Sequence, residues 1–334
     1  MELFPSLRRA TMPASVDLPL ALLSLLGCLH VLGEHRAVRL LARPRSRRER
    51  WRAVSFYAGL LVILAALASP IDTLAEKLFW VHMVQHVMLL SVAAPLIVLG
   101  TPWSSIWRPL PLGLRRTIAK TISRSRWCIP LRALGRLLAR PIPAWIAFNV
   151  NLVVWHVPAA YDLAVRNRAV HDVEHVTFLL FGVLLWAQVL DSPPLRARLS
   201  AIHRVYFMVA SAIVGWIVSL VLIFASSPLY PAYAQLAHRP GGISALTDQQ
   251  LAGGVMLVPG SLAMTLFVFI QLYLWMGLDE DGSAPRRTGA RVCPPPPVPG
   301  GSNPPREHLP EPPAVEREPA PVSVAFAYQT QREV

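Results

Sequence analysis

Hydrophobic residues gather in long blocks along this chain, and short polar or basic segments separate the blocks. Seven blocks approach the length of about 20 residues that an α-helix needs to cross a bilayer. They cover residues 17–33, 53–68, 74–99, 141–158, 170–190, 205–225 and 247–278. The pattern predicts an all-α, polytopic membrane protein with seven transmembrane helices in one membrane domain, residues 17–278.

Three segments differ from these blocks in composition. Residues 1–16 form a short polar start, and residues 279–334, rich in Pro, Arg and Glu, predict a disordered tail with no core to bury. Residues 100–140 form a basic loop in which leucines recur at helical spacing, with arginines on another face. The leucines are Leu131, Leu134, Leu137 and Leu138. We therefore predict a helix in this loop that lies on the membrane surface.

The number of Lys and Arg residues alternates from loop to loop. The loops after the first, third and fifth blocks hold eight, nine and three, and those after the second, fourth and sixth hold none, two and one. Because cytoplasmic loops carry the excess of positive charge, we predict an N-terminus outside and a C-terminal tail in the cytoplasm. The net charge of +13 is then a signal of topology. We expect the lipid bilayer, and no nucleic acid, as its partner.

Two histidine pairs stand inside or at the mouth of the hydrophobic blocks. His82 and His86 form one pair, and His171 and His175 form the other. In each pair the spacing of four residues puts both imidazoles on one face of a helix. The predicted topology places both pairs in the outer half of the membrane. Each pair is thus able to point two ligands toward one shared point.

Other chemically active side chains fall at the same predicted depth, and they come from further blocks. They are His156, Asp248 and Met256. Ionisable groups inside a membrane are costly and usually mark a functional site. Imidazole suits copper and zinc, thioether favours Cu(I), and the widely spaced cysteines offer no thiolate pair. We therefore predict a copper site that these residues form with the two histidine pairs. Glu174, Asp172 and Gln249 are predicted to support it by orienting its ligands.

Two other interpretations of the same residues remain open. His171-x-x-Glu174-His175 matches the inverted zinc-peptidase motif, with Glu174 as general base, and this predicts an intramembrane zinc hydrolase. A single haem between His86 and His175 would instead predict a membrane redox protein. It would leave the remaining histidines without a role.

The membrane part also resembles a known family. The motifs that carry the resemblance are His82-Met-x-Gln-His86, Ala94-Pro95-Leu-x-x-Leu-Gly100, His156-x-Pro158-x-x-Tyr161, His171-x-x-Glu174-His175, and Asp248-Gln249 followed by a Gly-Gly pair and Met256. In this order they resemble the multi-pass CtaG family of bacterial assembly factors for caa-type cytochrome c oxidase. One position departs from the pattern, since Leu257 stands where an aromatic residue is expected.

The resemblance implies a seven-helix protein of the bacterial cell membrane that is not an enzyme. It implies a part in maturing the oxidase by supplying copper, with oxidase subunits or other copper chaperones as partners. The five histidines named above would be the metal-handling positions, and Asp248 and Met256 would support them.

Overall fold

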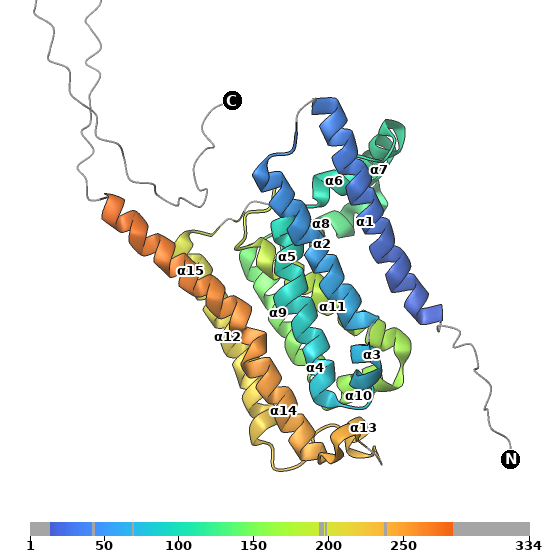
Figure 1. Ribbon diagram of the computed structural model, residues 1–334, viewed down its shortest axis with the longest axis vertical. Coiled ribbons are helices and arrows are strands. Elements are labelled where there is room, and N and C mark those ends of the chain that lie inside the picture. The colour runs from blue at the N-terminus through green and yellow to red at the C-terminus, as the bar shows by residue number, and fades with distance from the viewer. Residues whose placement is uncertain are drawn as a thin grey trace, which may run out of the picture. The chain divides into compact units, whose positions relative to one another are not determined.

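Long helices run beside one another through the part of the chain that the structure describes (Figure 1). This computed structural model describes residues 14–41, 44–68, 70–193, 197, 199–236 and 239–282. The predicted polar start and the predicted tail lie almost entirely outside these residues. Every regular element within them is a helix, which confirms the predicted all-α class.

The helices differ widely in length. The longer ones are α1 (Ala14–Leu41), α2 (Arg47–Leu67), α7 (Leu112–Arg124), α8 (Ile129–Leu138), α9 (Pro141–Trp155), α11 (Arg168–Ala187), α12 (Ala201–Phe224), α14 (Ala245–Leu257) and α15 (Pro259–Gly282). The shorter ones are α3 (Pro70–Ala75), α4 (Phe79–Val87), η1 (Met88–Ala93), α5 (Ala94–Gly100), α6 (Trp103–Trp107), η2 (Arg126–Cys128), α10 (Pro158–Arg166), α13 (Pro231–Ala234) and η3 (Pro240–Gly242).

Five helical segments in the described residues are long and apolar enough to cross a membrane. They are Arg47–Leu67, Phe79–Gly100, Arg168–Ala187, Ala201–Phe224 and Ala245–Gly277. These segments coincide with the predicted second, third, fifth, sixth and seventh spans. The predicted first span falls within α1, which is 28 residues long but is not among the five. Seven spans and the orientation of the termini remain predictions.

The predicted fourth span begins at a sharp bend. The segment Arg126–Leu138 and the helix Pro141–Trp155 meet at 94°, and together they make a sixth candidate span if the pair counts as one. The leucines at positions 131, 134 and 137 are exposed along the first of these segments. A helix at a right angle to its neighbour, with an exposed apolar face, fits the surface helix predicted in the basic loop.

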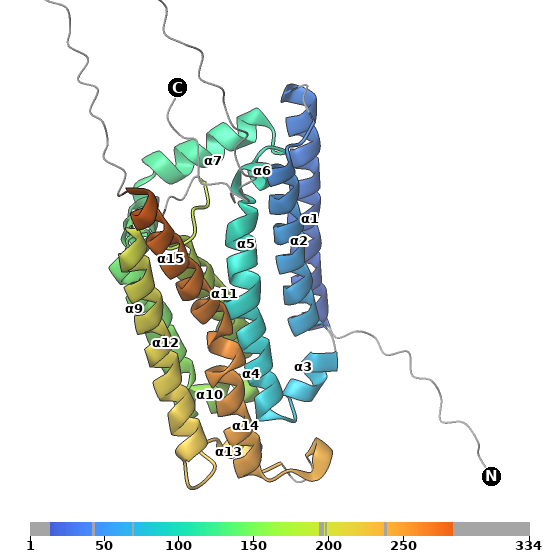
Figure 2. The same cartoon turned by 60° about the vertical axis from the view of Figure 1, so that its left-hand side comes forward.

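The segment Phe79–Gly100 is one continuous helix formed by α4, η1 and α5 (Figure 2). Its middle, η1, is a π-helical turn, which is wider than an α-helix. Pro95 explains the widening. In a regular α-helix its ring would clash with the carbonyl of Ser91, and it has no N–H to donate there. The chain forms a π-helical turn instead, in which Ala94 N–H bonds to Leu89 O, five residues back.

The wider turn frees a carbonyl inside the protein. Leu90 O would accept from the N–H five residues further on, but that residue is Pro95. The indole Nε1 of Trp186 in α11 donates to Leu90 O at 3.0 Å, so the buried oxygen keeps a hydrogen bond. This bond joins the two helices that carry the histidine pairs, one turn beyond His86.

Glycine allows α14 to lie close against α12. A Cβ added at Gly253 would stand 2.7 Å from Ile223 Cγ1 and 2.8 Å from the backbone oxygen of Ser219. A Cβ at the next residue, Gly254, would meet nothing within 4 Å. Small residues at helix contacts in membranes commonly serve this purpose, and here only the first glycine of the pair does so.

These two neighbouring glycines provide a matched test of helix packing. We expect Gly253→Ala to destabilise the protein by about 1–3 kcal/mol, because α12 and α14 must move apart. We expect Gly254→Ala to be neutral or to stabilise by up to about 1 kcal/mol, because alanine favours the helix. Thermal unfolding of the purified protein in detergent compares them. Equal losses from both variants would contradict the close contact at Gly253.

Candidate metal centre

α4 lies at the end of the long helices where α3 and α10 are also found (Figures 1 and 2). Buried polar side chains gather where α4 packs against α11. α4 supplies His82 and His86, and α11 supplies Glu174 and His175, all of which are at most 5% exposed. α11 also supplies His171, which is only partly buried. We refer to these five residues as the polar group.

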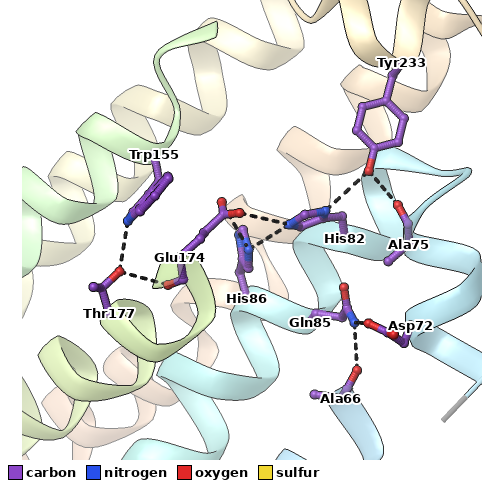
Figure 3. Close-up of polar contacts among 10 residues, drawn as sticks. All are labelled: Ala66, Asp72, Ala75, His82, Gln85, His86, Trp155, Glu174, Thr177 and Tyr233. Carbon is purple, nitrogen blue, oxygen red and sulfur yellow. Dashed lines mark hydrogen bonds and ion pairs between the residues drawn. The ribbon is translucent and has the colours of Figure 1, made fainter. Parts of the chain in front are cut away.

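His82, His86 and Glu174 lie in contact where α4 meets α11 (Figure 3). The Nε2 atoms of His82 and His86 are 2.9 Å apart. Glu174 Oε1 lies 3.5 Å from His86 Nε2, and Glu174 Oε2 lies 3.7 Å from His82 Nε2. The carboxylate therefore lies near both nitrogens without reaching the distance of an ordinary hydrogen bond.

The second histidine pair completes the polar group. The ring centroids of His171 and His175 are 4.2 Å apart. The His82 ring lies 5.1 Å from His171 and 5.7 Å from His175, and the His86 ring lies 5.3 Å from His175. The structure thus brings both pairs to one place, each from its own helix.

The residues fit a metal ion by the positions of their ligand atoms. Ligand atoms of His82, His86 and Glu174 all lie within 4.8 Å of one another, and so do those of His82, His171 and His175. A tetrahedral ion with metal–nitrogen bonds of about 2.0–2.1 Å holds its ligand nitrogens roughly 3.3 Å apart. The 2.9 Å between the Nε2 atoms of the first pair is close to that separation.

Buried atoms without partners support the same fit. Within the described residues, neither carboxylate oxygen of Glu174 has a hydrogen bond, and neither does Nε2 of His175. Buried polar atoms are nearly always satisfied, so such a set calls for an explanation. A cation bound among these side chains would give such atoms a partner.

Tyr233, in α13, determines which ring nitrogen of His82 carries the lone pair. Its hydroxyl donates to Ala75 O at 2.5 Å and lies 3.3 Å from His82 Nδ1. Burial raises the pKa of Tyr233 above its ordinary value, so the hydroxyl keeps its single proton. Because that proton goes to Ala75 O, the donor in the second contact is His82 Nδ1–H. The lone pair of His82 is then on Nε2, which faces His86 and Glu174.

Asp248 and Gln249 hold helices in place at a distance from the polar group. Asp248 Oδ2 accepts from Phe79 N–H and Oδ1 accepts from Trp80 N–H, both at 3.0 Å. These are the first two amides of α4, so the carboxylate caps the helix that carries His82. Gln249 accepts from Leu229 N–H at 2.7 Å and donates to Leu222 O at 3.1 Å.

The other predicted site residues lie around the polar group. His156 and Met256 line an apolar cavity that His86 also lines. Asp172 is half exposed, and it forms an ion pair of 3.4 Å with Arg168. The structure therefore places Asp172, Asp248 and Gln249 outside the polar group, and it places Glu174 among the possible ligands.

Besides Tyr233, three supporting residues were not predicted from the sequence: Gln85, Trp155 and Thr177. Gln85, fully buried between the first two histidines, donates to Ala66 O at 2.8 Å and to Asp72 Oδ1 at 3.1 Å, which fixes α4 against α2 and α3 (Figure 3). Trp155 donates to Thr177 Oγ1, whose hydroxyl donates to Glu174 O, both at 2.9 Å. Gln85 lies within the recognised His-Met-x-Gln-His motif, which was the one available signal.

Comparison with known proteins gives a family match and distant relatives. The model of the cytochrome c oxidase caa3 assembly factor family, Caa3_CtaG, matches residues 35–277. Uncharacterized proteins of Mycobacterium bovis and Mycobacterium tuberculosis are 23% identical over 249 residues, which is 72% of this chain and 36% of theirs. One of Mycobacterium leprae is 21% identical over 235 residues, 69% of this chain and 35% of its own.

The chain thus spans about a third of the length of these curated relatives. No solved structure matches it significantly.

Proposed function

The chain belongs to the cytochrome c oxidase caa3 assembly factor family, and on that premise we propose that it holds copper on its polar group and supplies it to the oxidase during assembly. The recipient is an oxidase subunit whose copper centre is being built, or another copper chaperone that serves it. The protein lies in the bacterial cell membrane with the polar group toward the outer face, and its role is not catalytic.

One observation carries this proposal. Two histidine pairs and Glu174 converge from two helices, and several of their ligand atoms are buried without hydrogen bonds. Imidazole is a ligand of choice for copper. The carboxylate offsets positive charge in a place that is shielded from water.

The exposure of the ligands suggests how the metal enters and leaves. His171 is the least buried of the four histidines, whereas His82, His86 and His175 are 2%, 3% and 5% exposed. We propose that a partner reaches the ion through His171. Tyr233 keeps the lone pair of His82 directed at the ion, and Gln85 keeps α4 in position while the ligands exchange.

Space also favours an ion over haem. The rings of His86 and His175 are in edge contact with those of His82 and His171. A porphyrin between them would have to displace both neighbours.

A zinc hydrolase is the second candidate, because His82, His171 and His175 form a three-histidine set. Such a set resembles a catalytic zinc site with three protein ligands and an open position. Glu174 would then activate a water. This candidate predicts that a variant without the carboxylate keeps its metal, a point on which the two proposals differ.

Metal analysis of the purified protein tests the copper proposal. We expect the intact chain to retain copper after loading and removal of excess metal, and we expect the variant His82→Ala/His86→Ala/His171→Ala/His175→Ala to lose it. The exposed histidines His35 and His203 provide the matched control, since replacing both with alanine leaves the polar group intact. The proposal would be overturned if the intact chain, the quadruple variant and the control variant all retained copper equally, or if none of them retained it.

A deletion strain tests the biological role. We expect it to contain caa-type oxidase with reduced copper content and activity, and we expect added copper to restore part of both. The intact gene should complement the strain and the quadruple alanine variant should not. Oxidase with a full complement of copper in the deletion strain would contradict copper supply.

A further inference from the structure

A small apolar cavity lies beside the polar group, between α4, α9, α11, α12 and the α14–α15 segment. It measures about 50 Å³, and no carboxylate lines it. Three methionines line it, each from a different helix: Met83, Met256 and Met264. Met83 and Met264 belong to two different groups of buried hydrophobic residues, and Met256 packs against both groups. Two imidazoles, those of His86 and His156, also line it, together with the hydroxyl-bearing residues Ser211 and Ser261. Both hydroxyls donate to backbone carbonyls of their own helix segments.

His156 has a free lone pair at this cavity. Its Nδ1 lies 2.7 Å from Leu152 O. Because a carbonyl only accepts, Nδ1 carries the proton of the neutral ring and Nε2 carries the lone pair. Nε2 is buried, and within the described residues it has no hydrogen-bond partner.

The same reasoning assigns the lone pair of His86. Tyr233 places the lone pair of His82 on Nε2, so the 2.9 Å contact between the two Nε2 atoms requires His86 to be the donor. The lone pair of His86 is then on Nδ1. This atom is also buried and without a partner among the described residues, and the side chain as a whole is 3% exposed.

We propose that this cavity is a second, sulfur-containing metal site, specific for Cu(I). Its ligands are Nδ1 of His86 and Nε2 of His156, with thioether sulfurs of the three methionines. The inference rests on the proposed function, because it makes the cavity a second holding position for the same metal. Thioether and imidazole ligands in a dry, carboxylate-free cavity select Cu(I) over the hard cations that require oxygen.

His86 links the two sites. A neutral imidazole has one lone pair, so His86 binds a metal either through Nδ1 in the cavity or through Nε2 in the polar group. When copper passes from the cavity to the polar group, the proton of His86 moves from Nε2 to Nδ1 and no net charge is released. Because only one of the two sites can use the lone pair of His86 at a time, the two sites hold the copper in turn.

X-ray absorption on the Cu(I)-loaded protein in detergent tests the second site. We expect sulfur scatterers around copper in the wild-type protein. We expect them to disappear in Met83→Leu/Met256→Leu/Met264→Leu, a change that nearly conserves volume. A triple variant at methionines that do not line the cavity, Met88→Leu/Met208→Leu/Met276→Leu, is the matched control and should keep the sulfur signal.

A further variant separates this inference from the proposed function. His82→Ala/His171→Ala/His175→Ala dismantles the polar group but keeps His86, and we expect it to retain sulfur-bound Cu(I). If wild-type copper has only nitrogen and oxygen neighbours, or if the cavity variant keeps its sulfur signal, the second site is overturned while copper binding by the polar group stands. If no variant differs because the wild type binds no copper, the proposed function fails first.

Discussion

We expect Glu174→Gln to lower the proposed affinity of the polar group for copper by at least about 10- to 100-fold, the range seen when an outer partner of a metal ligand is lost. The carboxylate lies 3.5 Å and 3.7 Å from the Nε2 atoms of His86 and His82, within reach of an ion bound between them. Glutamine keeps the shape of the side chain and removes its charge. Competition with a chelator of known affinity, on the purified protein in detergent, measures the loss.

The same substitution has a second, opposite effect on the metal-free protein. A buried carboxylate without hydrogen bonds is destabilising, so Glu174→Gln should unfold at the same temperature as the wild type or higher when no copper is present. Copper then raises the unfolding temperature of the variant less than that of the wild type, because stabilisation by a ligand follows its affinity. A lower unfolding temperature for the metal-free variant would contradict an unsatisfied carboxylate.

Asp172→Asn is the matched control for Glu174→Gln. It removes a carboxylate from the same helix, two residues away, but this one is half exposed and paired with Arg168. We expect no change in copper affinity. If Glu174→Gln keeps full copper affinity and loses a cleavage activity, the zinc-hydrolase candidate replaces the copper proposal.

Asp248→Ala is expected to have the largest effect on stability, a loss of about 3 kcal/mol or more. Charge-assisted hydrogen bonds contribute about 1.5–3 kcal/mol each, and Asp248 accepts two of them while fully buried. Removing it leaves the amides of Phe79 and Trp80 without acceptors inside the protein. Asp248→Asn keeps one acceptor oxygen and should lose roughly half as much. Denaturant or thermal unfolding in detergent ranks the wild type, Asp248→Asn and Asp248→Ala by stability.

Loss of this cap should also disturb the polar group, to which α4 contributes His82 and His86. His82 lies three residues after the start of α4, so fraying of the first turn moves its ring. Hydrogen exchange at Phe79 and Trp80 should become faster in the alanine variant, and copper affinity should fall in parallel with stability. If copper binding is lost while stability and exchange stay unchanged, Asp248 is a ligand, as the sequence analysis proposed, and the capping account is wrong.

The histidine pairs were predictable because two simple regularities locate them. A spacing of four residues puts both rings of a pair on one helix face, and the hydrophobic blocks place the pairs near the ends of their helices. The family resemblance supported the same histidines, because the motifs that contain them occur in the order typical of the family. The helical class and five of the predicted spans follow from the same blocks, since their length and composition suffice.

The roles of the neighbouring residues were not predictable, because they depend on contacts between distant segments. Asp248 caps a helix that begins 169 positions earlier, measured from Phe79. Tyr233 lies between two predicted spans, outside every hydrophobic block, and its contact with His82 joins residues 151 positions apart. His156 shares a predicted depth with the histidine pairs, but depth alone does not show which cavity its ring lines.

Pro95 has a consequence for how rigidly the proposed metal site is held. Because it lacks an N–H, Pro95 leaves Leu90 O free, and Trp186 of α11 donates to this oxygen in η1, one turn beyond His86. A site formed by two helices that are joined by a hydrogen bond adapts little to an ion of a different radius or preferred coordination. The ligands are also ordered before the ion arrives, so binding costs little conformational entropy. Under the copper proposal, a single missing proton donor in the backbone thereby helps to determine which ions the protein accepts.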